Sequence, residues 1–416
     1  MSILLRNIKI IDPSSVWHGM SKSLFVNKEG LVEEFENQDF EKEIDAEEMF
    51  AFPGLCDFQV NFCEPGLDYR EDISSGVNAA AKGGVTCVLQ VPNTDPIIDS
   101  KEVISFLKQK ASDKIVDLKI ICASSKETKG TELTEILEAS EYGADAFGDG
   151  YKNIWHSGLL IKTLQYLKHT DKLLINQPYD VNLSSHGLMH EGVQSTVNGI
   201  PGIPSFVESM AIKRDLEILR YAGGKLHFAQ LSTRESVELV REAKNEGLNV
   251  TCGVNYYHLI KTDEELADFD TNNKIMPPLR SSEDRDALVK GVKDGVIDVI
   301  VSNHRPQHED DKKLEFNYAE NGKIGVQTMF IALKSKTDLS DEDLHRTLVV
   351  NPRNMLGVST KIEINQKANF FIFEQKDFTL NSKDILSKSK NTAEIGQLFK
   401  YQIVGTINGR EHKFFN

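Results

Sequence analysis

The sequence predicts an α/β protein in which a (β/α)8 barrel is joined to a small β-sandwich domain built from both ends of the chain. Three observations support this fold class. The 416 residues are enough for one large and one small domain. Short alternating apolar patterns, typical of antiparallel strands, occur near both termini. Between them, strands of buried type alternate with helical stretches about eight times, which favours a closed barrel over an open doubly wound sheet.

The predicted sandwich domain combines residues 1–50 with residues 360–416. In both segments, short apolar runs of period two are separated by turn residues, which is typical of small antiparallel strands. Asn408-Gly409 is a hairpin turn signal near the end of the chain. The expected strands cover residues 3–11, 23–26 and 31–35 in the first segment and 361–364, 369–374, 401–407 and 412–415 in the second.

The predicted barrel covers residues 51–359. Its strands are short apolar runs, and each is followed by a stretch with helical periodicity, so we expect a parallel sheet. In such barrels the active residues lie just after the C-terminal ends of the strands. The clearest barrel strands are expected at residues 87–91, 118–122, 173–175, 225–229, 249–254 and 297–302.

Composition excludes several classes of function. Hydrophobic residues make up 40% and charged residues 27% of the chain, as in ordinary globular proteins. A net charge of -15, spread along the chain, disfavours binding to nucleic acid. No signal peptide and no apolar run of membrane-spanning length is found, so we expect a cytoplasmic protein without membrane contact. The five cysteines form no CxxC pair, which argues against a zinc knuckle or a disulfide framework.

Six ordered segments then point to one family. Residues 53–99 contain PGLCDFQVNFCEPGLDYRED and QVPNTDP, and the later segments are HEGVQSTVNGIPGIPSFVESMAIKRD, LSTRESVELVREAK, TNNKIMPPLRSSEDRDALVKGVKDGVIDVIVSNH, NPRNMLGV and SKSKNT. Together they resemble bacterial type I dihydroorotases of the amidohydrolase superfamily over essentially the whole chain. The resemblance implies an amidohydrolase barrel and a place in pyrimidine biosynthesis. In that family a metal-bound hydroxide attacks a cyclic amide carbonyl, interconverting dihydroorotate and N-carbamoyl-L-aspartate.

The family's metal ligands are replaced by amides in this sequence. By the resemblance, its histidine ligands fall on Gln59, Asn61, Gln177 and Gln230, and its ligand and general-base aspartate falls on Asn303. Gln59 and Asn61 are two residues apart on a strand, so both point into the barrel mouth. Zinc prefers imidazole, thiolate or carboxylate ligands, and an amide cannot accept a proton as a general base. We therefore expect no metal centre.

One acidic ligand position of the family falls within AFGDGYKNIW. Asp149 is a possible remnant of it, and Gly150 is a candidate for the position of a second aspartate. The register here and around Gln177 is left open. Lys152 lies nearby, and some amidohydrolases bridge two metals with a carboxylated lysine, but its distance from the strand end favours a surface lysine.

The pocket side chains are also altered. The family's carboxylate-gripping arginine falls on Cys63, and a thiol offers no bidentate charge pairing. Asn93 in PNTDP matches a substrate-contacting asparagine, but it is equally well explained as a turn residue that caps its loop. His304 is the third pocket candidate, because it matches a family position beside the site.

The remaining histidines do not suggest a replacement metal centre. His258 matches a family position beside the site rather than a ligand. His227 is expected to be a core histidine, and His308 lies in the charged loop HEDDKK.

We therefore expect a non-catalytic relative of the dihydroorotases. It resembles the inactive barrels that accompany aspartate transcarbamoylase in some bacteria, which implies a scaffold for that enzyme, and family membership implies a homodimer. Two alternatives stay open at this point. One is an active dihydroorotase or other cyclic amidohydrolase with an atypical zinc site. The other is a sensor that binds dihydroorotate or carbamoyl aspartate without turnover, although the loss of the arginine at Cys63 weakens it.

Overall fold

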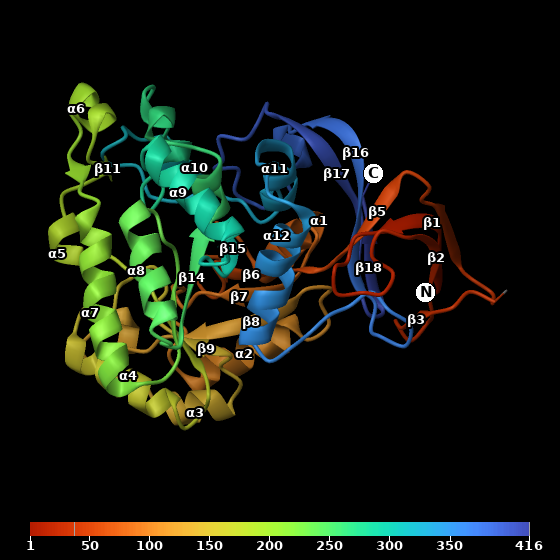
Figure 1. Ribbon diagram of the computed structural model, residues 1–416, viewed down its shortest axis with the longest axis horizontal. Coiled ribbons are helices and arrows are strands. Elements are labelled where there is room, and N and C mark those ends of the chain that lie inside the picture. The colour runs from red at the N-terminus through yellow and green to blue at the C-terminus, as the bar shows by residue number, and fades with distance from the viewer. Residues whose placement is uncertain (37, 416) are drawn as a thin grey trace.

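A computed structural model of the protein describes residues 1–36 and 38–415. Its two large sheets lie side by side: a parallel barrel surrounded by helices, and a second sheet that contains both ends of the chain (Figure 1). The predicted combination of a (β/α)8 barrel with a separate sheet domain is confirmed. We call the second sheet the terminal sheet.

The barrel sheet contains eight parallel strands in sequence order. A parallel bridge between Val60 and His304 brings the last strand against the first, and the backbone N–H of Asn61 donates to the carbonyl of His304 over 2.8 Å. The barrel is therefore closed by a short seam. The strands are β6 (Leu55–Val60), β7 (Val85–Gln90), β8 (Asp117–Cys122), β9 (Ala146–Phe147), β10 (Leu173–Asn176), β13 (Leu226–Phe228), β14 (Val250–Asn255) and β15 (Val299–Val301).

Helices cover the outside of the barrel, and their ends follow from the local sequence. The carboxylate of Asp72 caps α1 by accepting from the N–H of Ser75 over 2.7 Å. No helix in the described part of the chain has the length and apolar character needed to cross a membrane. The longer helices are α1 (Ile73–Lys82), α2 (Lys101–Ala111), α3 (Ile136–Glu141), α4 (Ser157–Leu167), α6 (Val193–Asn198), α7 (Phe206–Ala222), α8 (Arg234–Asn245), α9 (Ser282–Lys293) and α11 (Met329–Lys336).

Several shorter elements complete the barrel domain. β11 and β12 form a small parallel pair beside α6, away from the barrel strands. The short elements are α5 (Val181–Ser184), β11 (Met189–His190), β12 (Gly202–Ile203), α10 (Glu309–Lys312), α12 (Asp341–His345) and α13 (Asn351–Met355).

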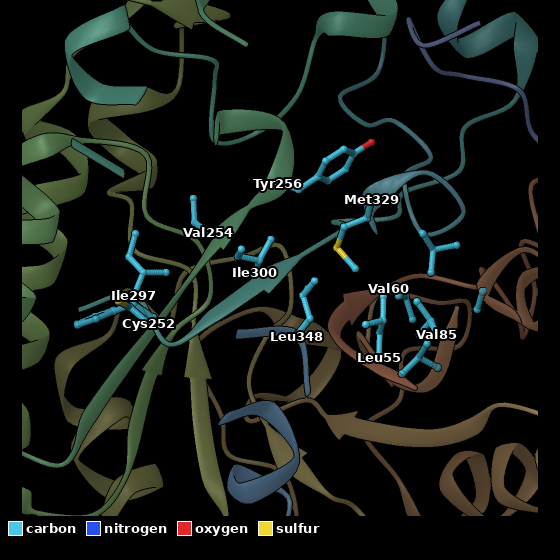
Figure 2. Close-up of a cluster of buried hydrophobic side chains, with 14 of the residues drawn as sticks. Leu55, Val60, Val85, Cys252, Val254, Tyr256, Ile297, Ile300, Met329 and Leu348 are labelled. Atoms are coloured by element: carbon cyan, nitrogen blue, oxygen red, sulfur yellow. The ribbon is translucent and has the colours of Figure 1, made fainter. Parts of the chain in front are cut away.

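The barrel separates two apolar cores. One lies inside it and includes Cys56, Phe58 and Leu89. The other lies between the strands and the surrounding helices, and Figure 2 shows part of it, including Leu55, Ile300 and Met329. All five cysteines are buried and free. Burial of these large side chains provides the main driving force for folding.

The terminal sheet joins strands from both ends of the chain. β5 pairs in parallel with β1 and antiparallel with β16, so residues 49–53 lie between strands from opposite ends of the sequence. All eight strands hydrogen-bond into one continuous sheet rather than two. Its path is β18 (Glu411–Phe414), β17 (Leu398–Asn408), β16 (Asn369–Thr379), β5 (Met49–Pro53), β1 (Ile3–Ile10), β2 (Ser21–Val26) and β3 (Val32–Glu33), and β4 (Lys42–Asp45) pairs with β1.

Two local predictions in the terminal sheet have different outcomes. The Asn408-Gly409 turn is confirmed, because Asn408 pairs with Glu411 across a hairpin and Gly409 has a φ of 62°. The predicted strand at residues 361–364 is wrong. There the N–H of Ile362 donates to a carboxylate oxygen of Asp12 over 2.8 Å, so a side chain replaces a neighbouring strand. The division of the chain near residues 50 and 360 stays a prediction.

A buried ionic cluster lies beside the last barrel strand, where Lys323 forms a bridge to His304. The ammonium of Lys323 lies 3.3 Å from a carboxylate oxygen of Glu394, and both side chains are almost fully buried. The same carboxylate oxygen accepts hydrogen bonds from Tyr256 (2.9 Å) and Thr328 (2.7 Å). We call these four residues the Lys323 cluster.

Candidate functional site

The five amide residues predicted to replace metal ligands lie at or just beyond the C-terminal ends of their strands. Gln59 and Asn61 belong to the end of β6, Gln177 follows β10, Gln230 follows β13, and Asn303 follows β15. Each is at most 5% exposed. We call this end of the barrel the mouth.

Gln59 and Gln230 hydrogen-bond to each other across the mouth. The Nε2 of Gln230 donates to the Oε1 of Gln59 over 2.8 Å. Because β6 and β13 are not neighbours in the sheet, this bond joins strands that pair with different partners. One neutral side chain thus donates to another at the two positions that the resemblance assigns to imidazoles, while the Oε1 of Gln230 has no partner among the described residues.

Asn61 uses both ends of its amide to hold the loops around the mouth. Its Oδ1 accepts from the N–H of Cys63 over 2.8 Å and from the Nε2 of Gln90 over 3.2 Å. Its Nδ2 donates to the carbonyl of Asn93 over 3.1 Å. The three bonds fix the direction of the chain after β6.

The other two amides also leave buried polar atoms without partners. Among the described residues, the Nε2 of Gln177 and the Oδ1 of Asn303 have no hydrogen-bond partner. The Nδ2 of Asn303 makes only a 3.4 Å contact with the carbonyl of Met276, and Asn303 has a φ of 48°. Buried polar atoms of this kind usually contact an ordered water or a ligand.

Asp149 is occupied by its own loop. Its Oδ1 accepts from the N–H groups of Ser124 and Ser125 over 3.0 and 2.9 Å, and its Oδ2 accepts from the Ser125 hydroxyl over 2.5 Å. Burial raises the pKa of this carboxyl, although the three hydrogen bonds oppose the effect. At Gly150, an added Cβ would lie 1.9 Å from the Oδ1 of Asn93, so no side chain fits there. Lys152 is exposed, in keeping with the surface reading.

Asn93 acts as a connector between loops. Its Oδ1 accepts from the N–H of Tyr151 over 3.0 Å, and its Nδ2 donates to the carbonyl of Asp149 over 3.2 Å. These bonds match the loop-capping reading of Asn93, and they use both ends of its amide.

Tyr151 and Arg305 are two mouth residues that the sequence reasoning did not single out. The Arg305 guanidinium lies 4.3 Å from the centre of the Tyr151 ring, a cation–π geometry. The Tyr179 hydroxyl donates to the carbonyl of Tyr151 over 3.0 Å. Tyr151 is two residues from Asp149, and Arg305 directly follows His304. This closeness to predicted site residues is the one sequence signal that could have indicated them.

The positions assigned to substrate binding are buried. Cys63 has a φ of 60° and is 2% exposed, and burial raises the pKa of its thiol to about 12. His304 accepts from the N–H of Gly325 over 3.2 Å at its Nδ1, and its Nε2 lies 3.6 Å from a carboxylate oxygen of Glu71. Burial raises the pKa of Glu71, but hydrogen bonding to His304 and Ser387 outweighs this and lowers it below the usual value.

Asp57 is the carboxylate at the base of the mouth. Its Oδ1 accepts from the N–H groups of Gln59 (3.2 Å) and Ser302 (3.1 Å), so it links β6 to the end of β15. Its Oδ2 has no partner in the part of the chain that the structure describes. Burial raises the pKa of Asp57 to about 6, because no cation compensates the charged form.

Three histidines outside the mouth each lie next to a hydrogen-bonding or charged group. His227 shares a 2.8 Å hydrogen bond with the Thr251 hydroxyl, and burial lowers its pKa to about 3. His258 is hydrogen-bonded to the carbonyl of Pro278 over 3.1 Å, and burial lowers its pKa to about 4. His308 is partly exposed and lies beside Asp310.

The residues at the mouth do not fit a zinc centre. Within residues 1–36 and 38–415, no three histidine, cysteine, aspartate or glutamate side chains are placed to hold a metal ion. The amide oxygens of Gln59 and Asn61 already accept hydrogen bonds, and amides are weak ligands for a borderline-soft cation.

Solved structures share this architecture. The L-hydantoinase (dihydropyrimidinase) from Arthrobacter aurescens superposes with a TM-score of 0.84 at 20% sequence identity, covering 100% of this chain and 97% of that chain. A D-hydantoinase structure gives 0.83 at 18% identity, covering 100% and 96%. These hydantoinases therefore share the fold of this chain, a parallel barrel with a separate sheet domain.

Sequence relatives define the family more narrowly. A family model described as dihydro-orotase-like matches residues 49–236. A dihydroorotase of Ruminiclostridium cellulolyticum is 36% identical over 419 residues, covering 97% of each chain. A dihydroorotase of Carboxydothermus hydrogenoformans is 40% identical over 363 residues, covering 85% of this chain and 84% of the relative. The chain belongs to the dihydroorotase-like family, as the six sequence segments predicted.

Proposed function

We propose that this protein is a non-catalytic member of the dihydroorotase-like family that needs no metal and acts by binding other proteins. The observation that carries the proposal is the 2.8 Å hydrogen bond between Gln59 and Gln230. This bond links two neutral side chains on opposite sides of the mouth without a cation. Asn303 supports the same conclusion, because an amide at the general-base position cannot take a proton from water.

Metal analysis combined with an activity assay tests this proposal. The purified full-length protein is analysed for zinc, cobalt and manganese, and dihydroorotase activity is measured in both directions with each metal added. We expect far less than one metal per chain and no turnover above background. One or two bound metals together with turnover that a chelator abolishes would contradict the proposal and establish an active enzyme with an atypical site.

A double variant tests the role of the two glutamines. Gln59→His combined with Gln230→His places imidazoles at positions close enough for the present side chains to hydrogen-bond. Because zinc accepts two such ligands readily, we expect zinc to raise the melting temperature of the double variant and not that of the wild type. The matched control is Gln402→His on the terminal sheet, which adds a histidine outside the mouth. A zinc-dependent shift in the wild type equal to that of the variant would contradict the proposal.

The proposed binding role includes assembly with aspartate transcarbamoylase and self-association as a homodimer. The sequence resemblance motivates both partners, and the surface offers a place for one. Val193 and Val197, one turn apart on α6, are 75% and 74% exposed. Exposed apolar side chains grouped in this way are typical of protein contacts.

Co-elution tests the proposed assembly. The full-length protein is mixed with aspartate transcarbamoylase from the same cell and passed over a sizing column. We expect a joint peak, which Val193→Asp with Val197→Asp abolishes while the circular dichroism spectrum is unchanged. Tyr221→Asp is the control, because Tyr221 is 77% exposed at the other end of α7. Separate elution of the wild-type proteins would rule out this partner.

A further inference from the structure

A cavity lies at the opposite end of the barrel from the mouth, between the barrel and the terminal sheet. It has a volume of about 410 Å³, within the usual range for small-molecule sites. The end of α2, the start of β8 and the segment after α13 form its walls. The mouth residues discussed above are not among the residues that line it, so it is a separate site.

Arg353 lines this cavity as a buried charge without a carboxylate partner. It is 3% exposed, and its Nη2 donates to the carbonyl of Gly54 (3.0 Å) and to side-chain oxygens of Thr86 (2.8 Å) and Asn369 (3.3 Å). Its Nε has no hydrogen-bond partner among the described residues, and none of their carboxylates lies within ion-pair distance. A buried guanidinium in this state is costly unless an anion binds to it.

Four lysines extend the positive charge along the cavity wall. Lys108 and Lys119 share one carboxylate, that of Asp145, at 2.7 and 3.3 Å. Lys361 pairs with Glu363 over 3.0 Å. Lys367 forms no ion pair within the described ranges, and Asp117 is the acidic residue on the wall.

The charges do not balance. The five cations face the carboxylates of Asp117, Asp145 and Glu363, so two positive charges remain. This excess is notable because the chain as a whole carries a net charge of -15. A cavity with two uncompensated positive charges matches a dianion.

We propose that this cavity binds a compact phosphate dianion, either inorganic phosphate or a small phosphate monoester. A guanidinium donates to phosphate oxygens in a fork geometry, and phosphate carries a charge of about -1.5 to -2 at neutral pH. The hydroxyl of Ser359 on the same wall supplies a further donor. The site is independent of the function proposed for the mouth.

Titration calorimetry at low salt tests the site with the full-length protein. The probes are inorganic phosphate and glycerol 3-phosphate, and acetate is the control anion. We expect saturable binding of one phosphate compound per chain and no binding of acetate. Preference for one probe over the other distinguishes free phosphate from a phosphate monoester. No saturable binding of either phosphate compound would overturn the proposal.

Variants locate the site. Arg353→Gln is expected to weaken phosphate binding at least about tenfold, because it removes a charge-assisted hydrogen bond. Since Arg353 also holds Gly54 and Asn369, the second variant is the exposed Lys367→Glu, which reverses a charge without removing a buried side chain. It is expected to weaken binding about fivefold or more. Lys313→Glu, on the mouth side of the barrel, is the control, and equal binding by Lys367→Glu and wild type would place phosphate elsewhere.

Discussion

The mouth and the Lys323 cluster both hold polar side chains out of water near the last barrel strand, but by different means. The cluster keeps a full positive and a full negative charge, and its carboxylate is surrounded by donors from Lys323, Tyr256 and Thr328. The mouth holds mainly neutral amides, and it leaves the Nε2 of Gln177, the Oε1 of Gln230 and the Oδ1 of Asn303 without partners among the described residues.

This difference shows which of the two regions depends on a complete set of partners. A buried charge that loses its counter-charge is strongly destabilising, whereas an unpaired neutral amide costs much less. We therefore expect the protein to fold even when a single contact of the mouth is lost, so substitutions at the mouth should be tolerated. We do not expect the Lys323 cluster to tolerate the loss of a charged partner in this way.

The largest effect is expected from removing the negative charge of the cluster. Glu394→Ala leaves the ammonium of Lys323 buried without a counter-charge, so we expect the free energy of unfolding to fall by about 3–5 kcal/mol. Urea denaturation measures this loss. Glu246→Ala is the control, because Glu246 pairs with Arg220 at the surface and should contribute less than about 1 kcal/mol. Similar losses for both variants would remove the contrast between buried and exposed charges.

The carboxylate at the base of the mouth gives a pH-dependent effect. The pKa of Asp57 is raised to about 6 by burial, so the folded protein retains this proton above the pH at which the unfolded chain releases it. Its contribution to stability is therefore present at low pH and is lost as pH rises from about 4 to about 6. Relative to wild type, Asp57→Asn should gain about 2 kcal/mol in unfolding free energy over this range.

Chemical denaturation at several pH values measures the change. The control is Asp377→Asn, an exposed residue of β16, which should leave the wild-type behaviour unchanged. A difference between Asp57→Asn and wild type that stays constant from pH 4 to pH 7 would show that Asp57 titrates normally.

The smallest effect concerns the amide pair of the mouth. Gln230→Leu removes the donor to Gln59, so we expect a loss of about 1–2 kcal/mol from an unsatisfied buried oxygen. Replacing both glutamines by leucine removes the unpaired group and should cost less than the sum of the single changes. A double-mutant cycle from urea denaturation measures the coupling. Additive losses would mean that the two amides do not stabilise each other.

The sequence predicted most of the fold and the positions of the mouth, but not its contacts. Strand patterns located the barrel strands because each is a short apolar run followed by a helix, and β15 is an example. The period-two spacing of Gln59 and Asn61 placed both at the mouth. The hydrogen bond between Gln59 and Gln230 depends on how the barrel closes. No local sequence pattern predicts that contact.

Two further features depended on long-range contacts. Residues 361–364 have the apolar alternation of a strand, but the carboxylate of Asp12, from the other end of the chain, binds their backbone instead. The stacking of Arg305 on Tyr151 joins two loops that are far apart in the sequence. In both cases the residue types alone give no signal. The feature depends on a contact between residues that are far apart in the sequence.

The terminal sheet has a consequence for synthesis on the ribosome. β5 follows β1 to β4 early in the chain, but its partner β16 begins at Asn369, more than three hundred residues later. The hydroxyl of Thr406 on β17 also donates to the carbonyl of Ala81 at the end of α1. The edge of β5 that pairs with β16 therefore stays unpaired while the whole barrel is translated. A nascent chain that stalls after the barrel exposes a strand edge able to pair with another such chain.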